Sequence, residues 1–280
     1  MGTTTVVETA RRALGPAGVF LPFSRTSPAS ADQQREAVRR LERAGCRSVW
    51  TNEGVGGKDA LVQLAVLLAA TERMVFGTAI ANIWARAPQT AHGAAALLAQ
   101  AYPDRFVLGL GVGYPHQAAS VGREFGPPVA TMRDYLDQMT APTQLPAPDV
   151  AYPKIIGANG PKMLALAGQH ADGALPAMTP PEFTAQARQL LGPDRLLVVG
   201  LAVRVDDVDV VGDVVMVLEM HGIADGDREG GLAEALAGLL DVGLRRRGVG
   251  EKRGGERAGK RQRRNVPDAG RGRSGIMDHR

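Results

Sequence analysis

The feature that most constrains this chain is the alternation of short apolar runs with longer helical patterns through about residue 200. The apolar runs have the length of buried strands, and the patterns between them repeat apolar residues along one helical face. Parallel strands joined by crossover helices give this alternation. We therefore predict an α/β fold, with strands over residues 17–22, 48–51, 74–80, 105–110, 154–157, 174–176 and 196–203.

Residues that favour helix starts separate these runs. Ser30 with Gln33 three positions later has the capping-box pattern, and Asp59 precedes a wide apolar stripe. Pro88 and Pro161 suit the first turn of a helix. These signals predict that strands and helices alternate along the chain with short connections.

The number of strand–helix units favours a closed (β/α)8 barrel of the TIM type over an open sheet. An open doubly wound sheet normally carries phosphate-binding glycines after its first strand, and residues 21–24 (LPFS) contain none. In a barrel the ligand site lies at the C-terminal ends of the strands. Candidate site residues are therefore sought directly after each predicted strand.

The strongest candidate by this criterion is Gly157-Ala158-Asn159-Gly160, between a predicted strand and the helix that Pro161 opens. Small residues let a ligand approach the backbone closely, and the free amides at a helix start favour a phosphate group. A tight turn without a ligand accounts for the same residues equally well.

Three other positions follow predicted strands. The glycine run 109–113, with Gly111 at its centre, either admits a flat ring or relieves crowding at the rim. Asn52 and Glu53 either contact a cofactor ring or belong to a solvated loop. Trp84 follows another strand end, where it is placed to wall a substrate pocket, whereas Trp50 lies inside a strand and is expected in the core.

Several function classes lack support in the sequence. The five histidines have no paired spacing and no cysteine partners, so we expect no metal site. The hydrolase elbow and the nucleotide-binding P-loop are absent. No secretion signal or membrane-length apolar segment is present. With Cys46 as the single cysteine, these observations predict a reducing, cytoplasmic setting without a disulfide framework.

Three segments then resemble a known family. They are Ser48-Val49-Trp50 with Asn52-Glu53, residues 70–86 (ATERMVFGTAIANIWAR) and residues 104–113 (DRFVLGLGVG). In this order they resemble the luciferase-like monooxygenase superfamily, and most closely its branch of coenzyme F420-dependent oxidoreductases. The resemblance runs from about residue 16 to residue 198.

The resemblance implies a (β/α)8 barrel that holds coenzyme F420, or alternatively FMN, at its C-terminal mouth and acts on a small-molecule substrate. It implies a non-prolyl cis peptide at Ala79–Ile80 against the face of the ring, and cofactor phosphate at residues 157–160. Members often have an acidic residue followed by histidine where this chain has Asn52 and Glu53. The histidine is absent here, and Glu53 is our candidate catalytic residue. The resemblance also implies a homodimer.

The character of the chain changes near residue 199. All twelve aromatic residues lie at or before Phe183. Residues 200–244 are acidic, and residues 245–280 are basic. We predict most of a barrel domain over 1–199, a replaced barrel end over 200–247, and a disordered Arg- and Gly-rich tail over 248–280. If unrelated residues replace the barrel end, sheet edges are left open. A strand over 213–221 and a helix over 232–244 are further expectations.

Two explanations of this change remain open. A reading-frame shift in a GC-rich gene would replace the barrel end with unrelated residues, and we favour it. A genuine extension could instead bind nucleic acid or an acidic partner through its basic tail. The function hypotheses are accordingly an F420-dependent oxidoreductase, an FMN-dependent monooxygenase that uses a reductase and oxygen, and an inactive barrel remnant or binding module. Nucleic acid is not an expected partner of the first two.

Overall fold

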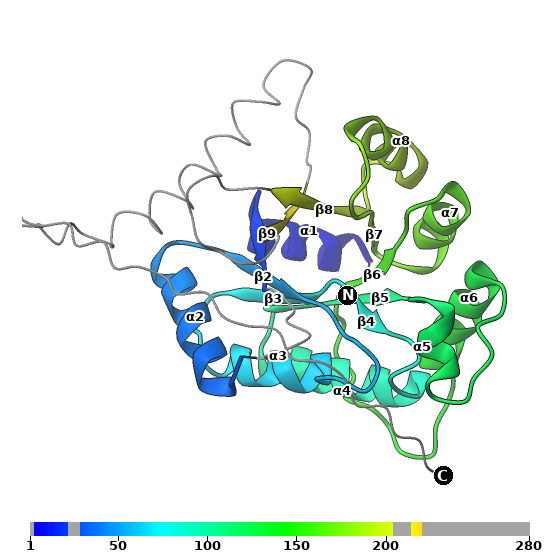
Figure 1. Cartoon of the computed structure of the whole chain (residues 1–280), viewed down its shortest axis with the longest axis horizontal. Coiled ribbons are helices and arrows are strands. Elements are labelled where there is room, and N and C mark those ends of the chain that lie inside the picture. Colours follow the sequence, from blue (N-terminus) through cyan, green and yellow to red (C-terminus); the bar gives the residue numbers. More distant parts are fainter. Residues whose placement is uncertain (1–2, 22–28, 204–213, 220–280) are drawn as a thin grey trace, which may run out of the picture. The chain divides into compact units, whose positions relative to one another are not determined.

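The computed structural model of the chain describes residues 3–21, 29–203 and 214–219 (Figure 1). Helices and strands alternate through most of these residues, as predicted. In chain order the elements are α1 (Thr3–Leu14), β1 (Gly18–Phe20), α2 (Ala31–Arg43), β2 (Ser48–Thr51), α3 (Ala60–Leu68), β3 (Val75–Thr78), β4 (Ala81–Asn82), α4 (Pro88–Ala101), β5 (Phe106–Gly111), α5 (Pro115–Ala119), α6 (Pro128–Met139), β6 (Lys154–Gly157), α7 (Pro161–His170), β7 (Gly173–Leu175), α8 (Pro181–Leu191), β8 (Leu196–Val203) and β9 (Val214–Glu219).

Eight of the strands pair in a ring. Seven of them run parallel, in the order β1, β2, β3, β5, β6, β7 and β8. The eighth position belongs to β9, which is antiparallel to both β8 and β1. The short strand β4 pairs beside the end of β5. The predicted α/β barrel is confirmed, and so is its alteration after residue 199, because a complete (β/α)8 barrel has only parallel strands.

The strand predicted over residues 213–221 is confirmed as β9, but the expected open edges are not found along it. Gly18 and Val19 of β1 pair with Val217 and Met216. On its other side β9 pairs with β8, from Val198–Glu219 to Val203–Val214. The reversed strand therefore satisfies backbone groups that a missing eighth strand would leave exposed.

Successive strand residues face opposite sides of the barrel wall. Phe106, Leu108 and Leu110 of β5 pack in the cluster beneath the surrounding helices. Val107 points to the other side, where it packs with Trp50 in the barrel interior. Trp50 is thus a core residue, as its strand position predicts.

Helix α1, which the sequence analysis did not predict, closes the base of the barrel. Its apolar residues Val7, Ala10 and Leu14 are buried in the interior cluster. The Arg11 guanidinium donates to the Pro193 and Arg195 carbonyl oxygens, next to the start of β8. These contacts place α1 at the N-terminal ends of the strands, opposite the mouth.

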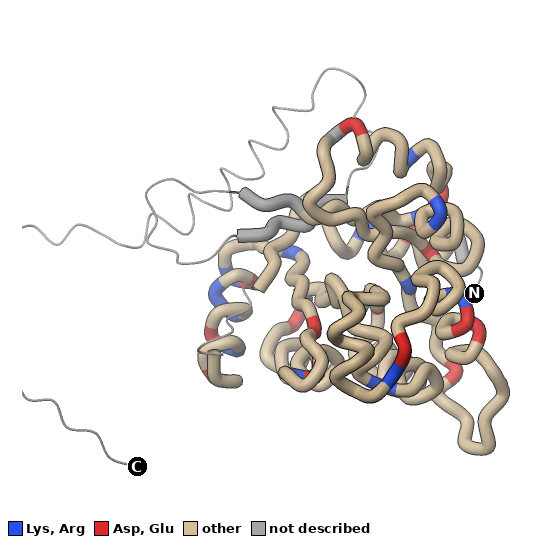
Figure 2. The backbone as a smooth tube through the Cα atoms, turned by 45° about the vertical axis from the view of Figure 1, so that its right-hand side comes forward, with Lys and Arg blue, Asp and Glu red and all other residues tan. Residues whose placement is uncertain are grey.

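The helix-start signals are confirmed in detail. Ser30 Oγ accepts from the Gln33 amide at 3.2 Å, and Gln33 Oε1 accepts from the Ser30 amide at 2.8 Å. Asp59 caps α3 through the Leu61 and Val62 amides. Figure 2 marks the charged residues: α2 carries both acidic and basic side chains, whereas α3 and α4 carry neither. Among the described residues, no helix has both the length and the apolar character needed to cross a bilayer.

Some expectations fall outside the described residues. They include the helix over 232–244, the tail over 248–280 and most of the segment over 200–247. The described residues do contain helices α5 and α6, between β5 and β6, for which the sequence analysis made no prediction.

Candidate functional site

The candidate site lies at the C-terminal mouth of the barrel. Because the seven paired strands from β1 to β8 are parallel, the segments that follow them reach the same end. These segments, together with the last residues of β5 and β6, carry every site residue predicted from the sequence: Asn52, Glu53, Ala79, Ile80, Trp84, Gly111, Gly157, Ala158, Asn159 and Gly160.

Ile80 and two glycines form the floor of this mouth. The peptide bond between Ala79 and Ile80 is cis, as the resemblance implied. A Cβ atom on Gly111 would lie 2.6 Å from Ile80 Cγ1, and one on Gly157 would lie 3.3 Å from Ile80 Cγ2. The Ile80 side chain therefore covers the ends of β5 and β6, and glycine at Gly111 makes room for it. Ala79 and Ile80 remain partly exposed.

The turn between β6 and α7 is held to the next strand by Asn159. Its side-chain nitrogen donates to the Ala177 carbonyl oxygen at 3.0 Å, and its side-chain oxygen accepts from the Ala177 amide at 2.9 Å. The buried Ala158 donates its amide to the Leu175 carbonyl oxygen at 3.1 Å. The Ala158 amide is therefore already used, and Asn159 positions the turn with both polar atoms of its side chain.

Gly160 leaves open space at the start of α7. A Cβ atom on Gly160 would meet no atom within 4 Å. Its backbone is extended, with φ −154° and ψ 156°, and Pro161 follows as the first helical residue. The amides of the first helical turn have no carbonyl partner inside a helix. This helix start therefore presents free donors beside an unfilled space, which suits an anion.

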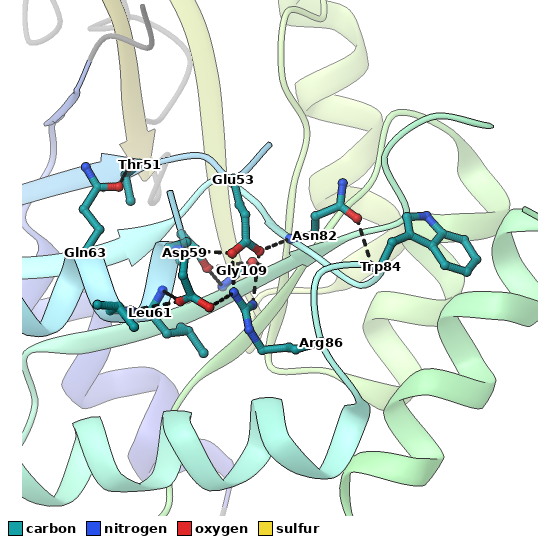
Figure 3. Close-up of polar contacts among 12 residues, drawn as sticks. Thr51, Glu53, Asp59, Leu61, Gln63, Asn82, Trp84, Arg86 and Gly109 are labelled. Atoms are coloured by element: carbon teal, nitrogen blue, oxygen red, sulfur yellow. Dashed lines mark hydrogen bonds and ion pairs between the residues drawn. The ribbon is translucent and has the colours of Figure 1, made fainter. Parts of the chain in front are cut away.

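A buried ion pair ties the segment after β2 to the segment after β4 (Figure 3). The Arg86 guanidinium contacts both oxygens of the Glu53 carboxylate and also Asp59 Oδ2, the latter at 2.8 Å. Glu53 accepts two further hydrogen bonds, from the Ala60 amide at 2.9 Å and the Asn82 amide at 2.8 Å. Every oxygen of this carboxylate therefore already has donors within the protein.

The charges of this cluster stabilise one another. Burial alone would lower the pKa of Arg86, but the hydrogen bonds and charges of Glu53 and Asp59 outweigh burial and raise it. Burial alone would also raise the pKa of Asp59. Hydrogen bonds from the Val62 and Leu61 amides and from Arg86 outweigh that effect, so this pKa is lowered. The cluster is thus a fixed group of charges.

Asn82 and Trp84 continue from this cluster toward β5. Asn82 is 1% exposed, and its Oδ1 accepts from the Trp84 amide at 3.0 Å. The indole of Trp84 donates from Nε1 to the Val112 carbonyl oxygen at 2.7 Å, and its ring lies 6.0 Å from that of Phe125. Trp84 is therefore locked between strand ends, with 8% of its surface exposed.

Thr78, the last residue of β3, holds that strand close to β5. Its hydroxyl donates to the Gly109 carbonyl oxygen at 2.7 Å and accepts from the Gly109 amide at 2.8 Å. A Cβ atom on Gly109 would overlap the Thr78 carbonyl oxygen. Of the glycine run after β5, Gly109 therefore serves close packing of strands, whereas Gly111 borders the mouth.

The sequence analysis found the strand ends but missed three polar residues there. It did not single out Thr78, Asn82 or Arg86, and it interpreted Asp59 only as a helix cap. Arg86 and Asn82 lie within the quoted run 70–86, but no spacing rule links either residue to Glu53. Among the residues that the structure describes, no group of three His, Cys, Asp or Glu side chains is arranged to bind a metal.

Comparison with known proteins agrees with this architecture. The sequence profile of the luciferase-like monooxygenase family matches residues 16–192. The chain is 29% identical over 188 residues to a Mycobacterium tuberculosis protein named as a coenzyme F420-dependent oxidoreductase, covering 56% of this chain and 54% of that protein. It is 27% identical to the 5,10-methylenetetrahydromethanopterin reductase of Methanolobus tindarius, covering 74% of this chain and 77% of the reductase.

The fold is also found in a solved complex with FMN. The oxygenating constituent of 3,6-diketocamphane monooxygenase from Pseudomonas putida superposes with a TM-score of 0.54 at 15% identity, over 63% of this chain and 61% of the other. At this identity the likeness concerns the fold alone. The chain spans about half the length of the mycobacterial relative, since 54% of that protein is matched.

Proposed function

The chain belongs to the luciferase-like monooxygenase family, and from this membership we propose that it is an oxidoreductase that transfers a hydride between coenzyme F420 and a small organic substrate. The mycobacterial and methanogen relatives, named as an F420-dependent oxidoreductase and as a reductase, support this choice. Within the family the cofactor carries the redox chemistry, and the protein supplies binding, orientation and electrostatics.

One observation carries the proposal: the mouth combines a surface for a flat ring with a site for a phosphate. The ring surface is the Ile80 side chain, which covers Gly111 and Gly157 at the ends of β5 and β6. Neither glycine has a side chain that would displace Ile80. The phosphate site is the start of α7, where Gly160 leaves open space beside free amides. Both features fit a cofactor that consists of a ring joined to a phosphate.

Each predicted residue receives a role under this proposal. Ile80, with Ala79, supports one face of the ring, and Gly111 gives the ring room at the end of β5. The backbone of residues 157–160 and the first turn of α7 bind the phosphate, with Asn159 holding the turn in place. Asn52 contacts the ring edge, and Trp84 borders the substrate pocket.

We propose that Glu53 holds the segments after β2 and β4 in place at the mouth of the barrel. The sequence analysis proposed Glu53 as the catalytic residue. Its carboxylate accepts from Ala60, Asn82 and Arg86, which leaves it well placed to fix the segments after β2 and β4. A carboxylate in such contacts is a strong organiser of backbone geometry. Proton transfer by Glu53 would require it to leave these partners.

FMN is the second candidate cofactor, because the same phosphate site and ring surface suit it and a protein of this fold binds it. Titration of the full-length chain with each cofactor, followed by fluorescence, separates the two. Saturable binding of coenzyme F420 alone supports the oxidoreductase. Preference for FMN would point instead to a monooxygenase. If a folded chain binds neither, both proposals fail, and an inactive barrel remnant or binding module is left.

A further inference from the structure

The side-chain amide of Asn82 has a buried hydrogen-bond donor without a partner. Asn82 is 1% exposed, and its Nδ2 makes no hydrogen bond within the described protein. Such atoms are uncommon, because burying an unsatisfied donor costs free energy. In the described residues the other such atom is Thr179 Oγ1, which also follows a strand at the mouth.

The orientation of this amide is set by its neighbours. Asn82 Oδ1 accepts from the Trp84 amide at 3.0 Å, so a flipped side chain would place a donor against that donor. The backbone of Asn82 is held at its amide by Glu53, which Arg86 holds in turn. Figure 3 shows the side-chain nitrogen directed away from Trp84, with no contact drawn to it. The Asn82 side chain is therefore held in one orientation, and its Nδ2 has no hydrogen-bond acceptor among the described residues.

The surroundings of this donor belong to the proposed cofactor site. Asn82 of β4 is paired with Gly111 of β5, and the Ile80 side chain packs against Gly111. A Cβ atom on Gly113 would lie 2.6 Å from Asn82 Nδ2 and would overlap Gln117 Oε1. The donor therefore lies beside the Gly113 backbone and near Gln117. The Gln117 side chain is partly exposed, and its Oε1 accepts from the Tyr114 amide at 2.8 Å, a hydrogen bond that is lost if the side chain turns aside.

We propose that Asn82 Nδ2 donates its hydrogen bond to an acceptor on the ring of the bound cofactor after Gln117 turns aside. This inference rests on the proposed function and assigns to it a positioning residue that fixes the ring against Ile80. Chemically, a carbonyl oxygen or an unprotonated nitrogen on the ring edge is the acceptor that a neutral amide recognises. Because Asn82 itself is already oriented, the reorganisation on binding is confined to the Gln117 side chain, which gives up its hydrogen bond from the Tyr114 amide.

The test is the pair of variants Asn82→Ser and Gln63→Ser. A serine at Asn82 can still accept from the Trp84 amide, but it lacks the amide nitrogen. Gln63 is a matched control because it is also a buried amide, but its side chain is fully bonded. Its Oε1 accepts from Thr51 at 2.9 Å, and its Nε2 donates to Gln34 at 2.5 Å.

The two variants are expected to behave in opposite ways. Asn82→Ser should bind the cofactor about three- to tenfold more weakly, with the unfolding midpoint of the ligand-free protein within about 3 °C of wild type. Gln63→Ser should keep the wild-type affinity and lower that midpoint by about 4–8 °C, because it loses two satisfied hydrogen bonds. The visible absorption of the bound cofactor should change only in Asn82→Ser.

The outcomes separate this inference from the proposed function. Equal affinity of wild type and Asn82→Ser, or a loss of stability without a loss of affinity, overturns the role of Asn82 alone. Failure of the wild type to bind either coenzyme F420 or FMN overturns the proposed function and this inference together. If Asn82→Ser does not fold, Asn82→Thr, which also keeps a hydroxyl oxygen for the Trp84 amide and lacks the amide nitrogen, carries the same expectation for affinity.

Discussion

The carboxylate of Glu53 and the guanidinium of Arg86 form an ion pair in which the two side chains are 2% and 9% exposed, respectively. They come from the segments after β2 and β4, and the pair holds these segments at a fixed separation. A buried charge is tolerated only while its partner and hydrogen bonds are present. The mouth of the barrel therefore depends on two residues that are distant in the sequence.

Replacing Arg86 with methionine should leave Glu53 as an uncompensated buried charge. We expect a loss of about 3–5 kcal/mol in the free energy of unfolding, measured by urea denaturation at neutral pH. Arg35→Met is the control, because Arg35 pairs with an Asp32 side chain that is 91% exposed. That control should change stability by no more than about 1 kcal/mol, and equal losses in the two variants would contradict the assignment.

Glu42 should make stability depend on acid pH. Burial alone would raise its pKa from the ordinary 4.5, but hydrogen bonds from the Arg73, Met74 and Glu72 amides outweigh burial, so the pKa is lowered. A lowered pKa stabilises the fold above the ordinary value, and this stabilisation is lost as the pH falls through the folded value. Because solvent screens this partly exposed carboxylate, wild type should exceed Glu42→Gln in stability by only about 0.5–1 kcal/mol at pH 7.

The difference between wild type and Glu42→Gln should shrink as the pH falls below 4.5, which denaturation at a series of pH values would measure. A difference that stays constant down to pH 3 would show that the carboxylate charge is not what holds residues 72–74.

Gly160→Ala tests the phosphate site without disturbing the fold. An alanine Cβ meets no protein atom there, and the extended backbone suits any residue, so stability should stay within about 1 kcal/mol of wild type. A phosphate bound against this backbone would meet the new methyl group, and cofactor affinity should fall at least about tenfold. Gly168→Ala, inside α7 and equally free of neighbours, should leave affinity unchanged.

Leu14→Ala tests whether α1 is part of the barrel core. Leu14 is 2% exposed in the interior cluster, so we expect a loss of about 2–5 kcal/mol. Leu190→Ala is the control, since Leu190 is 52% exposed, and it should cost less than about 1 kcal/mol. Chemical denaturation measures both. A loss for Leu14→Ala no larger than that of the control would mean that α1 does not seal the base.

We propose that the expected homodimer forms through α3 and α4. Neither helix contains Lys, Arg, Asp or Glu, although Val62 and Leu97 are 63% and 57% exposed. A helix without a charged face is usually covered. Leu97→Glu should shift light-scattering mass from dimer to monomer at micromolar concentration. A monomeric wild type, or a dimer that both Val62→Glu and Leu97→Glu leave intact, would contradict this interface.

The sequence predicts the barrel wall well because each strand and helix there carries its own local signal. Ser30, Asp59 and Pro161 mark helix starts by their chemistry alone, and all three were confirmed. Helix α1 was missed because its apolar residues alternate with polar ones in a short segment before the first strand. The helix is buried because it packs against the barrel interior, and this tertiary contact is not indicated by the local sequence pattern.

The polar cluster at the mouth was predicted only in part for a similar reason. Glu53 was singled out by its position after a strand, whereas its partner Arg86 follows β4 without a spacing rule that joins the two. Their contact results from the cross-strand arrangement of β2, β3 and β5. Pairings of this kind depend on tertiary geometry.

The reversed strand β9 also bears on the order in which the barrel forms. Its pairing with β8 joins neighbours in the chain, which favours early formation. Its pairing with β1, at Gly18–Val217 and Val19–Met216, joins opposite ends of the described chain. We therefore expect the other strands of the wall to pair before the short β1–β9 seam closes the barrel. The same seam is where the cylinder would first reopen, and hydrogen exchange at its amides would register that opening.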